Sequence, residues 1–239
     1  MDTLAKALIS RASGQSKLRV DDVVICEVDL AMIHDSGGPR RVKPILDRLQ
    51  RQVWDKDKIV VVTDHYVPAD NAETQAIQAL TKQWVQDQSI DKFYDEQGIC
   101  HVVLPERGHL APGLFCVGGD SHSPTGGAFG AYMFGIGATE MAGVLATGEI
   151  WIKVPETILM SWRNQLSAYV TAKDMMLVMC RKIGMGGGRY QAIQYAGQTI
   201  QELSMQERMT LSNMAAELGA QAGLIAPDEA TVAFVQAAG

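Results

Sequence analysis

The sequence predicts an α/β fold in which helices pack against a mostly parallel sheet. The run at residues 59–63, Ile-Val-Val-Val-Thr, is apolar and β-branched throughout, as in a strand buried on both faces. Longer segments with helical patterns alternate with such runs. Loops rich in Gly, Asp, Ser or His follow them, most clearly at residues 118–127. Functional side chains are therefore expected in loops at the carboxyl ends of the strands.

The N-terminal half carries helical and strand patterns in alternation. We expect a helix over 2–14 that ends at Gly14, a strand over 20–30, a helix over 40–54, a strand over 59–63 and a helix over 70–88. The turn Ser-Gly-Gly-Pro at 36–39 leads into the second helix. The apolar runs over 100–104 and 113–117 are expected to be further strands.

The C-terminal half is expected to begin with a helix of small residues. That helix covers 128–147, and strands follow over 150–154 and 157–162. Two capping boxes, Thr171 with Asp174 and Ser204 with Glu207, predict helices that run to about residues 183 and 219. The glycines of 184–188 form a flexible loop that resembles a phosphate-binding loop only loosely, because no strand–GxGxxG–helix order surrounds it.

Composition narrows the functional classes. The 239 residues carry a formal net charge of −6, and 47% of them are hydrophobic. The acidic balance argues against nucleic-acid binding, which needs a surplus of Lys and Arg. No apolar run reaches the ~20 residues that span a bilayer, so no membrane partner is expected. The first residues have no basic segment before an apolar one, and we expect a cytoplasmic protein.

The cysteines do not have the spacing of a metal or cluster site. Cys26, Cys100, Cys116 and Cys180 form no Cys-x-x-Cys pair, and each lies in apolar sequence. We expect buried free thiols.

Acidic and histidine side chains adjoin at several expected strand ends. The pairs are His34-Asp35, Asp64-His65 and, in the loop at 118–127, Asp120-Ser121-His122. An Asp bonded to one ring nitrogen of a His fixes the tautomer and raises the basicity, as a general acid or base requires. A single His is most often structural, but repeated pairs are harder to explain that way.

Two other interpretations of these side chains remain open. Ser121 could be a nucleophile, although no Gly-x-Ser-x-Gly elbow surrounds it. Asp64, His65, Asp120 and His122 could instead bind one divalent metal ion, although their spacing is not that of a compact zinc site.

Several ordered segments resemble the aconitase superfamily, above all the large subunits of 3-isopropylmalate dehydratase and homoaconitase. These segments are residues 64–68 (Asp-His-Tyr-Val-Pro), 98–101 (Gly-Ile-Cys-His), 118–124 (Gly-Gly-Asp-Ser-His-Ser-Pro), 127–130 (Gly-Ala-Phe-Gly), 213–220 and 222–229. The resemblance implies an aconitase-like three-layer α/β/α fold. It also implies that residues 1–239 are the N-terminal portion of the catalytic region.

The resemblance implies a hydro-lyase that removes and re-adds water in a small hydroxy-dicarboxylic or hydroxy-tricarboxylic acid. The catalytic residues it implies are Asp64, His65, His101, Asp120, His122 and Glu217. The substrate-binding residues it implies are His34, Arg40, Ser121 and Ser123. His109, in Glu-Arg-Gly-His, matches no functional position of the family and is expected to be a loop residue.

The family's [4Fe-4S] cluster is expected in the complete enzyme, but its cysteine ligands lie beyond the matching region. The serine base that removes the carbon-bound proton belongs to a separate swivelling domain, so a small swivelling-domain subunit is an expected partner. The isolated chain should then be inactive or nearly so. The alternatives are a non-catalytic remnant that acts in subunit assembly or ligand binding, and a mononuclear metal-dependent lyase.

Overall fold

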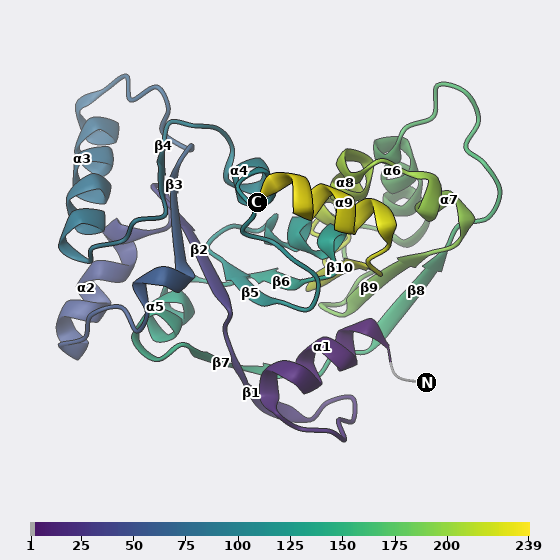
Figure 1. The fold of residues 1–239 in the computed structure, drawn as a ribbon, viewed down its shortest axis with the longest axis horizontal. Helices are drawn as coiled ribbons and strands as arrows, with labels where there is room; N and C mark the ends of the chain where they lie inside the picture. Colours follow the sequence, from purple (N-terminus) through teal and green to yellow (C-terminus); the bar gives the residue numbers. More distant parts are fainter. Residues whose placement is uncertain (1–2) are drawn as a thin grey trace.

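The computed structural model describes residues 3–239 and contains three sheets within that range (Figure 1). The largest has five parallel strands in the order β4-β3-β2-β5-β6. A second has three parallel strands in the order β10-β9-β8, and β1 pairs with β7 in an antiparallel ribbon. The prediction of a mostly parallel α/β fold is therefore confirmed.

The strands are β1 (Val23–Glu27), β2 (Leu30–His34), β3 (Ile59–Thr63), β4 (Phe93–Asp95), β5 (Phe115–Gly118), β6 (Tyr132–Gly135), β7 (Glu149–Lys153), β8 (Thr157–Ser161), β9 (Ala192–Ala196) and β10 (Ala222–Ile225). The α-helices are α1 (Leu4–Ser13), α2 (Pro39–Leu49), α3 (Ala72–Asp87), α4 (Cys100–Glu106), α5 (Ala138–Thr147), α6 (Ala172–Ile183), α7 (Gln198–Glu202), α8 (Met205–Asn213) and α9 (Glu229–Ala238). Two 3-10 helices are η1 (Lys56–Lys58) and η2 (Ser123–Phe129).

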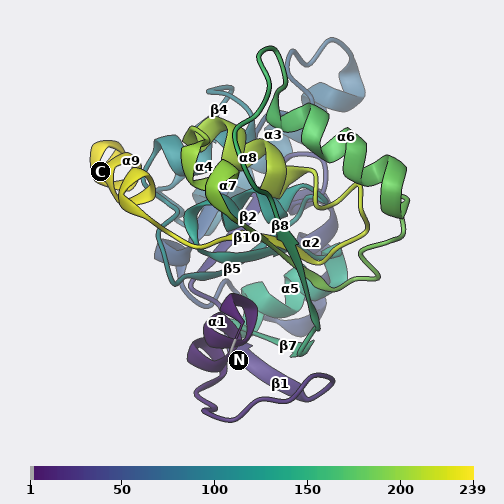
Figure 2. The same cartoon turned by 90° about the vertical axis from the view of Figure 1, so that its right-hand side faces the viewer.

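Alternating residues of the five-stranded sheet enter two different cores. Ile33 and Val61 face one core together with side chains of α1, α2, α3 and α5. Met32 and Val60 face the other, with side chains of α4, η2 and α8. Successive side chains of a strand point to opposite faces, so helices cover the sheet on both sides. Figure 1 shows α2 and α3 on one side of β2 and β3 and α4 on the other, and in Figure 2 α8 lies in front of the sheet.

Helix α8 joins the large sheet to the three-stranded one. Its Met205 belongs to the core beside the large sheet, and its Leu211 packs in the core of β8, β9 and α6. The turns that follow α8 are consequently held next to η2, which carries side chains of the loop after β5. This packing places residue 217 close to the carboxyl edge of the large sheet.

Several expected elements differ in the structure. The strand expected over 20–30 is two strands, β1 and β2, in different sheets. The helix expected over 128–147 is interrupted: Gly130, with φ 71°, ends η2, and β6 then pairs with β5 before α5 begins. The helix expected over 204–219 ends at Asn213 and continues as turns.

The run at 100–104 forms helix α4, so the expectation of a strand there was wrong. Its buried residues Cys100, Val103 and Leu104 have the i, i+3, i+4 spacing of a helix face. The carboxylate of Asp64 also accepts the N–H of Cys100, at 2.7 Å, and so satisfies one of the unpaired donors at the start of the helix. A contact across 36 residues thus favours helix over strand.

The other expected elements are confirmed, although the helix expected over 40–54 ends at Leu49. They correspond to α1, α2, β3, α3, β5, β7, β8 and α6, with a turn-rich loop at 184–188. The sequence patterns did not predict β4, β9, α7, β10 and α9. None of the helices within residues 3–239 is both long and apolar enough to cross a membrane.

Gly127 is expected to tolerate no side chain. A Cβ added there would overlap the carbonyl oxygen of Gly223, where η2 packs against β10. Gly127→Ala should lower the free energy of unfolding by about 3 kcal/mol, measured by urea denaturation. Gly143→Ala, in α5 with no neighbour within 4 Å of the added atom, is the matched control and should be neutral or slightly stabilising. Equal effects of the two variants would contradict the close approach.

Candidate active site

The predicted side chains lie at the carboxyl ends of three adjacent strands of the large sheet. His34 is the last residue of β2, Asp64 follows β3, and Asp120 lies just beyond β5. Because β3, β2 and β5 are neighbours and parallel, their carboxyl ends lie side by side. His101, near the start of α4, and Glu217, in the turns after α8, complete the group.

His65 lies between two carboxylates. Its Nδ1 is 2.6 Å from Oδ1 of Asp64, and its Nε2 is 3.5 Å from Oδ2 of Asp120. Both ring nitrogens must carry protons to donate to both partners, so the charged imidazolium fits this position. The hydrogen bonds to Asp120 and Asp64 raise the pKa of His65 to about 10.

Asp64 connects His65 to helix α4. One oxygen bonds the imidazole, and the other accepts the N–H of Cys100. Burial by itself would raise the pKa of the Asp64 carboxyl, but these hydrogen bonds outweigh burial, so its pKa lies below the ordinary value. Asp64 is therefore an anion that holds the imidazolium in place.

Asp120 is the centre of the group. Its Oδ1 accepts from Nε2 of His101, at 2.8 Å, and from the backbone N–H of His122, at 2.7 Å. Burial alone would raise the pKa of the Asp120 carboxyl. The hydrogen bonds from the two imidazoles and the backbone N–H outweigh burial and hold its pKa far below the usual range.

His122 pairs with Glu217 across 95 residues of sequence. The distance from Nε2 of His122 to Oε1 of Glu217 is 3.0 Å, and Oγ of Ser121 lies 3.3 Å from Nδ1. The second oxygen of Glu217 is buried and has no hydrogen-bond partner among the described residues. Such an acceptor is costly unless a donor reaches it, which fits a site completed by another group.

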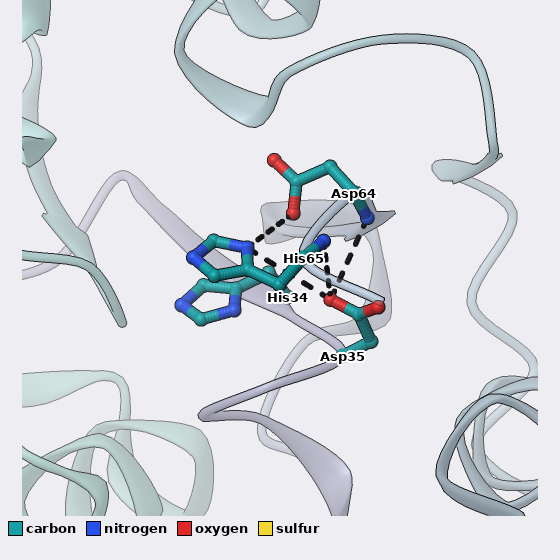
Figure 3. A group of neighbouring side chains, drawn as sticks. All are labelled: His34, Asp35, Asp64 and His65. Atoms are coloured by element: carbon teal, nitrogen blue, oxygen red, sulfur yellow. Dashed lines mark hydrogen bonds and ion pairs between the residues drawn. The ribbon is translucent and has the colours of Figure 1, made fainter. Parts of the chain in front are cut away.

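His34 lies beneath His65. Its ring stacks on that of His65, with centroids 3.9 Å apart (Figure 3). The N–H of Gly37 points at Nδ1 of His34, so Nε2 carries the proton and donates to the carbonyl of Gly119, at 3.0 Å. Burial and the nearby charge of His65 lower the pKa of His34, which is consistent with a neutral ring.

Arg40 borders the site from the first turn of α2. Its Nε donates to the carbonyl of Ser36, at 2.9 Å, and its Nη2 to the hydroxyl of Tyr66, at 3.4 Å. The guanidinium carbon also lies 5.7 Å from the centroid of the Tyr66 ring. These contacts hold the guanidinium against Tyr66, the residue that follows His65.

The two predicted serines lie differently. Ser121 is exposed at the rim. Ser123 is fully buried, and its hydroxyl donates to the backbone carbonyl of Asp120, at 2.7 Å. In this arrangement Ser123 stabilises the loop that carries Asp120 and does not face the site, so its contact with substrate stays a prediction. His109 lies apart from the site, with Nε2 2.6 Å from the hydroxyl of Tyr94.

Two hollows flank the site that is formed by the acidic and histidine side chains of residues 64, 65, 101, 120, 122 and 217. One, of about 520 Å³, is lined in part by His101, Asn213 and Glu217. The other, of about 370 Å³, is lined in part by Asp120 and Ser121. Each volume is enough for a small organic acid.

The cysteines of the described chain do not fit as ligands of an iron–sulfur cluster. None of them belongs to a group of neighbouring His, Cys, Asp or Glu side chains in residues 3–239. Burial raises the pKa of the Cys26 thiol to about 12, and it also raises the pKa values of Cys100 and Cys116. Cluster ligands are thiolates, and these thiols are held in the neutral form.

The four ligands of the alternative metal site do not form one set. Asp64 and His65 group with His34 and Asp35, whereas Asp120 and His122 group with His101. In both groups carboxylates already bond imidazole nitrogens, as in the contact of 2.6 Å between Asp64 and His65. The arrangement therefore favours proton-carrying pairs over a mononuclear metal centre.

Asp35 was noted in the sequence as the neighbour of His34, but no role was assigned to it. It is fully buried, and its carboxylate accepts backbone N–H groups of the loop that carries His65 (Figure 3). The adjacent pair His34-Asp35 at a strand end was the available signal. Nothing local indicates that the Asp side chain points under the next loop.

Comparison with known proteins agrees with the resemblance that the sequence motifs indicate. The model of the aconitase family (aconitate hydratase) matches residues 6–239. The chain is 43% identical over 235 residues to the probable 3-isopropylmalate dehydratase large subunit of Methanothermobacter thermautotrophicus, covering 98% of this chain and 56% of that protein. It is 44% identical over 214 residues to the probable methanogen homoaconitase large subunit of Methanosarcina mazei, covering 89% of this chain and 55% of that protein.

The chain thus spans about half the length of the curated relatives it matches. Among solved structures, the crystal structure of Thermococcus kodakaraensis aconitase X aligns with a TM-score of 0.49 and 9% identity, over 93% of this chain and 57% of that one.

Proposed function

This chain belongs to the aconitase family, and from that premise we propose that it supplies the acid–base residues of a hydro-lyase. The reaction removes water from a small hydroxy-dicarboxylic or hydroxy-tricarboxylic acid and adds it back. The relatives' names, 3-isopropylmalate dehydratase and homoaconitase, indicate the class of substrate. Because the chain spans about half of those proteins, the proposal concerns its share of a larger active site.

The chemistry of dehydration determines which groups this chain must contribute to the active site. Dehydration breaks a C–O bond and a neighbouring C–H bond: the hydroxyl leaves as water after it takes up a proton, and a base removes the carbon-bound proton. A proton donor at the leaving oxygen therefore needs a position with a protonated group near neutral pH. His65 satisfies this condition because the hydrogen bonds to Asp120 and Asp64 raise its pKa to about 10.

One observation carries the proposal: three carboxylate–imidazole pairs converge at the carboxyl edge of a parallel sheet. They are Asp64 with His65, Asp120 with His101, and Glu217 with His122. A structural role for one such pair would be unremarkable, but three pairs around two hollows support proton transfer. We assign protonation of the leaving hydroxyl to this group as a whole.

Substrate carboxylates need cations or hydrogen-bond donors. We propose that Arg40 and the hydroxyl of Ser121 bind them, with His34 forming the floor under His65. Arg suits this role because its planar guanidinium matches a carboxylate. Contact of Ser123 with substrate is also proposed, and it would require the hydroxyl to leave its bond to the backbone carbonyl of Asp120.

A [4Fe-4S] cluster is implied by the family resemblance, and it would supply a Lewis acid for the leaving oxygen. Since the described cysteines do not fit as ligands, we propose that the ligands come from outside this chain. The relatives are named large subunits, which supports a small-subunit partner. We propose that this partner brings the base for the carbon-bound proton.

The test combines the chain with the missing parts of the enzyme, which are the cluster-binding segment and the small subunit. The chain would be produced both alone and extended to the relatives' full length with a small subunit, and each preparation assayed with 3-isopropylmalate and related hydroxy diacids. We expect the unsaturated product, followed by ultraviolet absorbance, only from the assembly. Turnover by the 239-residue chain alone would contradict the proposal that the cluster ligands and the base come from outside it.

The assembly also separates the proposal from the alternative of a non-catalytic remnant. Iron and sulfide analysis should give about four irons per assembly. An iron-free assembly without turnover on any diacid would favour a non-catalytic remnant.

A further inference from the structure

Asp35 is a buried carboxylate directly beneath the loop that presents His65 (Figure 3). We propose that Asp35 is a positioning residue: it gathers the backbone N–H groups of residues 64–66 onto its carboxylate and thereby fixes the His65 imidazole between Asp64 and Asp120. This inference deepens the proposed hydro-lyase function and rests on it.

Both oxygens of Asp35 are engaged. Oδ1 accepts the N–H of Ser36 at 3.0 Å and that of His65 at 3.1 Å, and it lies 3.5 Å from the backbone nitrogen of Asp64. Oδ2 accepts the N–H of Tyr66, at 3.0 Å. Three consecutive backbone donors therefore converge on one anion, as in an anion-binding nest.

The sheet anchors Asp35 itself. Its own N–H donates to the carbonyl of Val62, at 3.2 Å, which extends the pairing of β2 with β3 by one residue. The carboxylate thus projects from a rigid strand end, and the loop after β3 adapts to it. Sites built on rigid elements hold side chains more accurately than loops do by themselves.

The charges around His65 agree with this role. On the loop after β3 it faces Asp64, on the loop after β5 it faces Asp120, and on β2 it stacks on His34. Asp35 adds a third carboxylate, with Oδ1 3.9 Å from Nδ1 of His65. A further acidic side chain thus lies within ion-pair distance of the His65 ring.

An amide could not replace this carboxylate. Asparagine keeps one oxygen but turns an NH₂ group toward at least one backbone N–H, which leaves that donor unpaired. Asp35→Asn should therefore free the loop at 64–66 while keeping the size of the side chain.

The first experiment titrates His65 by NMR in the 239-residue chain, with the His65 signal assigned by its loss in His65→Gln. Asp35→Asn should lower the pKa of His65 by about one unit relative to the wild-type chain. Asp29→Asn is the matched control: Asp29 also accepts a backbone N–H, that of Phe115, but at the opposite end of β2, and its substitution should leave His65 unchanged.

The second experiment measures turnover of the assembled enzyme. Asp35→Asn should lower kcat by about 10²-fold through misplacement of His65, with a smaller change in KM. An active wild-type assembly that keeps full turnover and an unshifted His65 pKa after Asp35→Asn would overturn the positioning role alone. An inactive wild-type assembly would count against the proposed function, and the NMR titration would still test Asp35.

A measurement on the wild-type chain covers the case in which Asp35→Asn does not fold. Hydrogen exchange at the amides of His65 and Tyr66 should be slow, because both donate to a buried carboxylate. Exchange as fast as that of an exposed loop would overturn the inference.

Discussion

Asp120→Asn is expected to lower turnover of the assembled enzyme by about 10²–10⁴-fold, the range for loss of acid–base catalysis. Asp120 accepts from His101 and from the backbone of His122 through Oδ1, and it faces His65 through Oδ2. Asparagine can keep the Oδ1 contacts, but it removes the negative charge and turns an NH₂ group toward one of the imidazoles. The loss should therefore appear in kcat more than in folding.

The pH dependence of stability provides a second readout for Asp120. Its pKa is lower in the folded chain than the usual value of 3.8, so the anion stabilises the fold above pH 3.8. That contribution disappears as the pH falls through the depressed folded-state pKa. Denaturation of wild type and Asp120→Asn should consequently differ most near neutral pH and converge in acid.

The matched control for Asp120→Asn is again Asp29→Asn, at the far end of the sheet. It should leave turnover unchanged. If both variants retain wild-type kcat, the carboxylate of Asp120 has no part in the chemistry, and the three-pair description of the site is wrong.

Arg208→Met is expected to lower the free energy of unfolding by about 3 kcal/mol, the largest stability effect among single charge removals here. The Arg208 side chain is 0% exposed. Its guanidinium donates to the carbonyls of Leu203 and Gln201, at 3.1 and 2.9 Å, and to Asp228, at 2.7 Å. Methionine fills a similar volume but leaves these acceptors without their donor.

The location of Arg208 explains why so much depends on it. It lies in α8, between the segment that carries α7 and the start of α9, where Asp228 caps the helix. The hydrogen bonds to Arg208 and burial act in opposite directions on the Asp228 carboxyl; the hydrogen bonds dominate, and its pKa is lowered. Because α8 also leads to Glu217, loosening it should disturb the site.

Urea denaturation measures the Arg208→Met effect, with Arg11→Met as the control. Arg11 pairs with Asp29 on the surface, where an ion pair contributes only about 0–1 kcal/mol. A stability loss for Arg208→Met no larger than that of Arg11→Met would mean that the buried contacts of α8 contribute little.

Local sequence determined much of this molecule. The β-branched run at 59–63 is strand β3, and the capping boxes at Thr171 and Ser204 begin α6 and α8 where expected. The acidic–histidine motifs marked residues that the fold brings to one edge of a sheet. These predictions succeed because strand composition, helix caps and strand-end loops are set by neighbours in sequence.

Tertiary structure alone decided the pairings within the site. His122 meets Glu217 across 95 residues, and Asp35 reaches a loop 30 residues away. The run at 100–104 became a helix because a distant carboxylate satisfies its first turn and its apolar face packs on the sheet. Which loops meet depends on strand order and helix packing, and those arise from contacts between distant segments that no local pattern encodes.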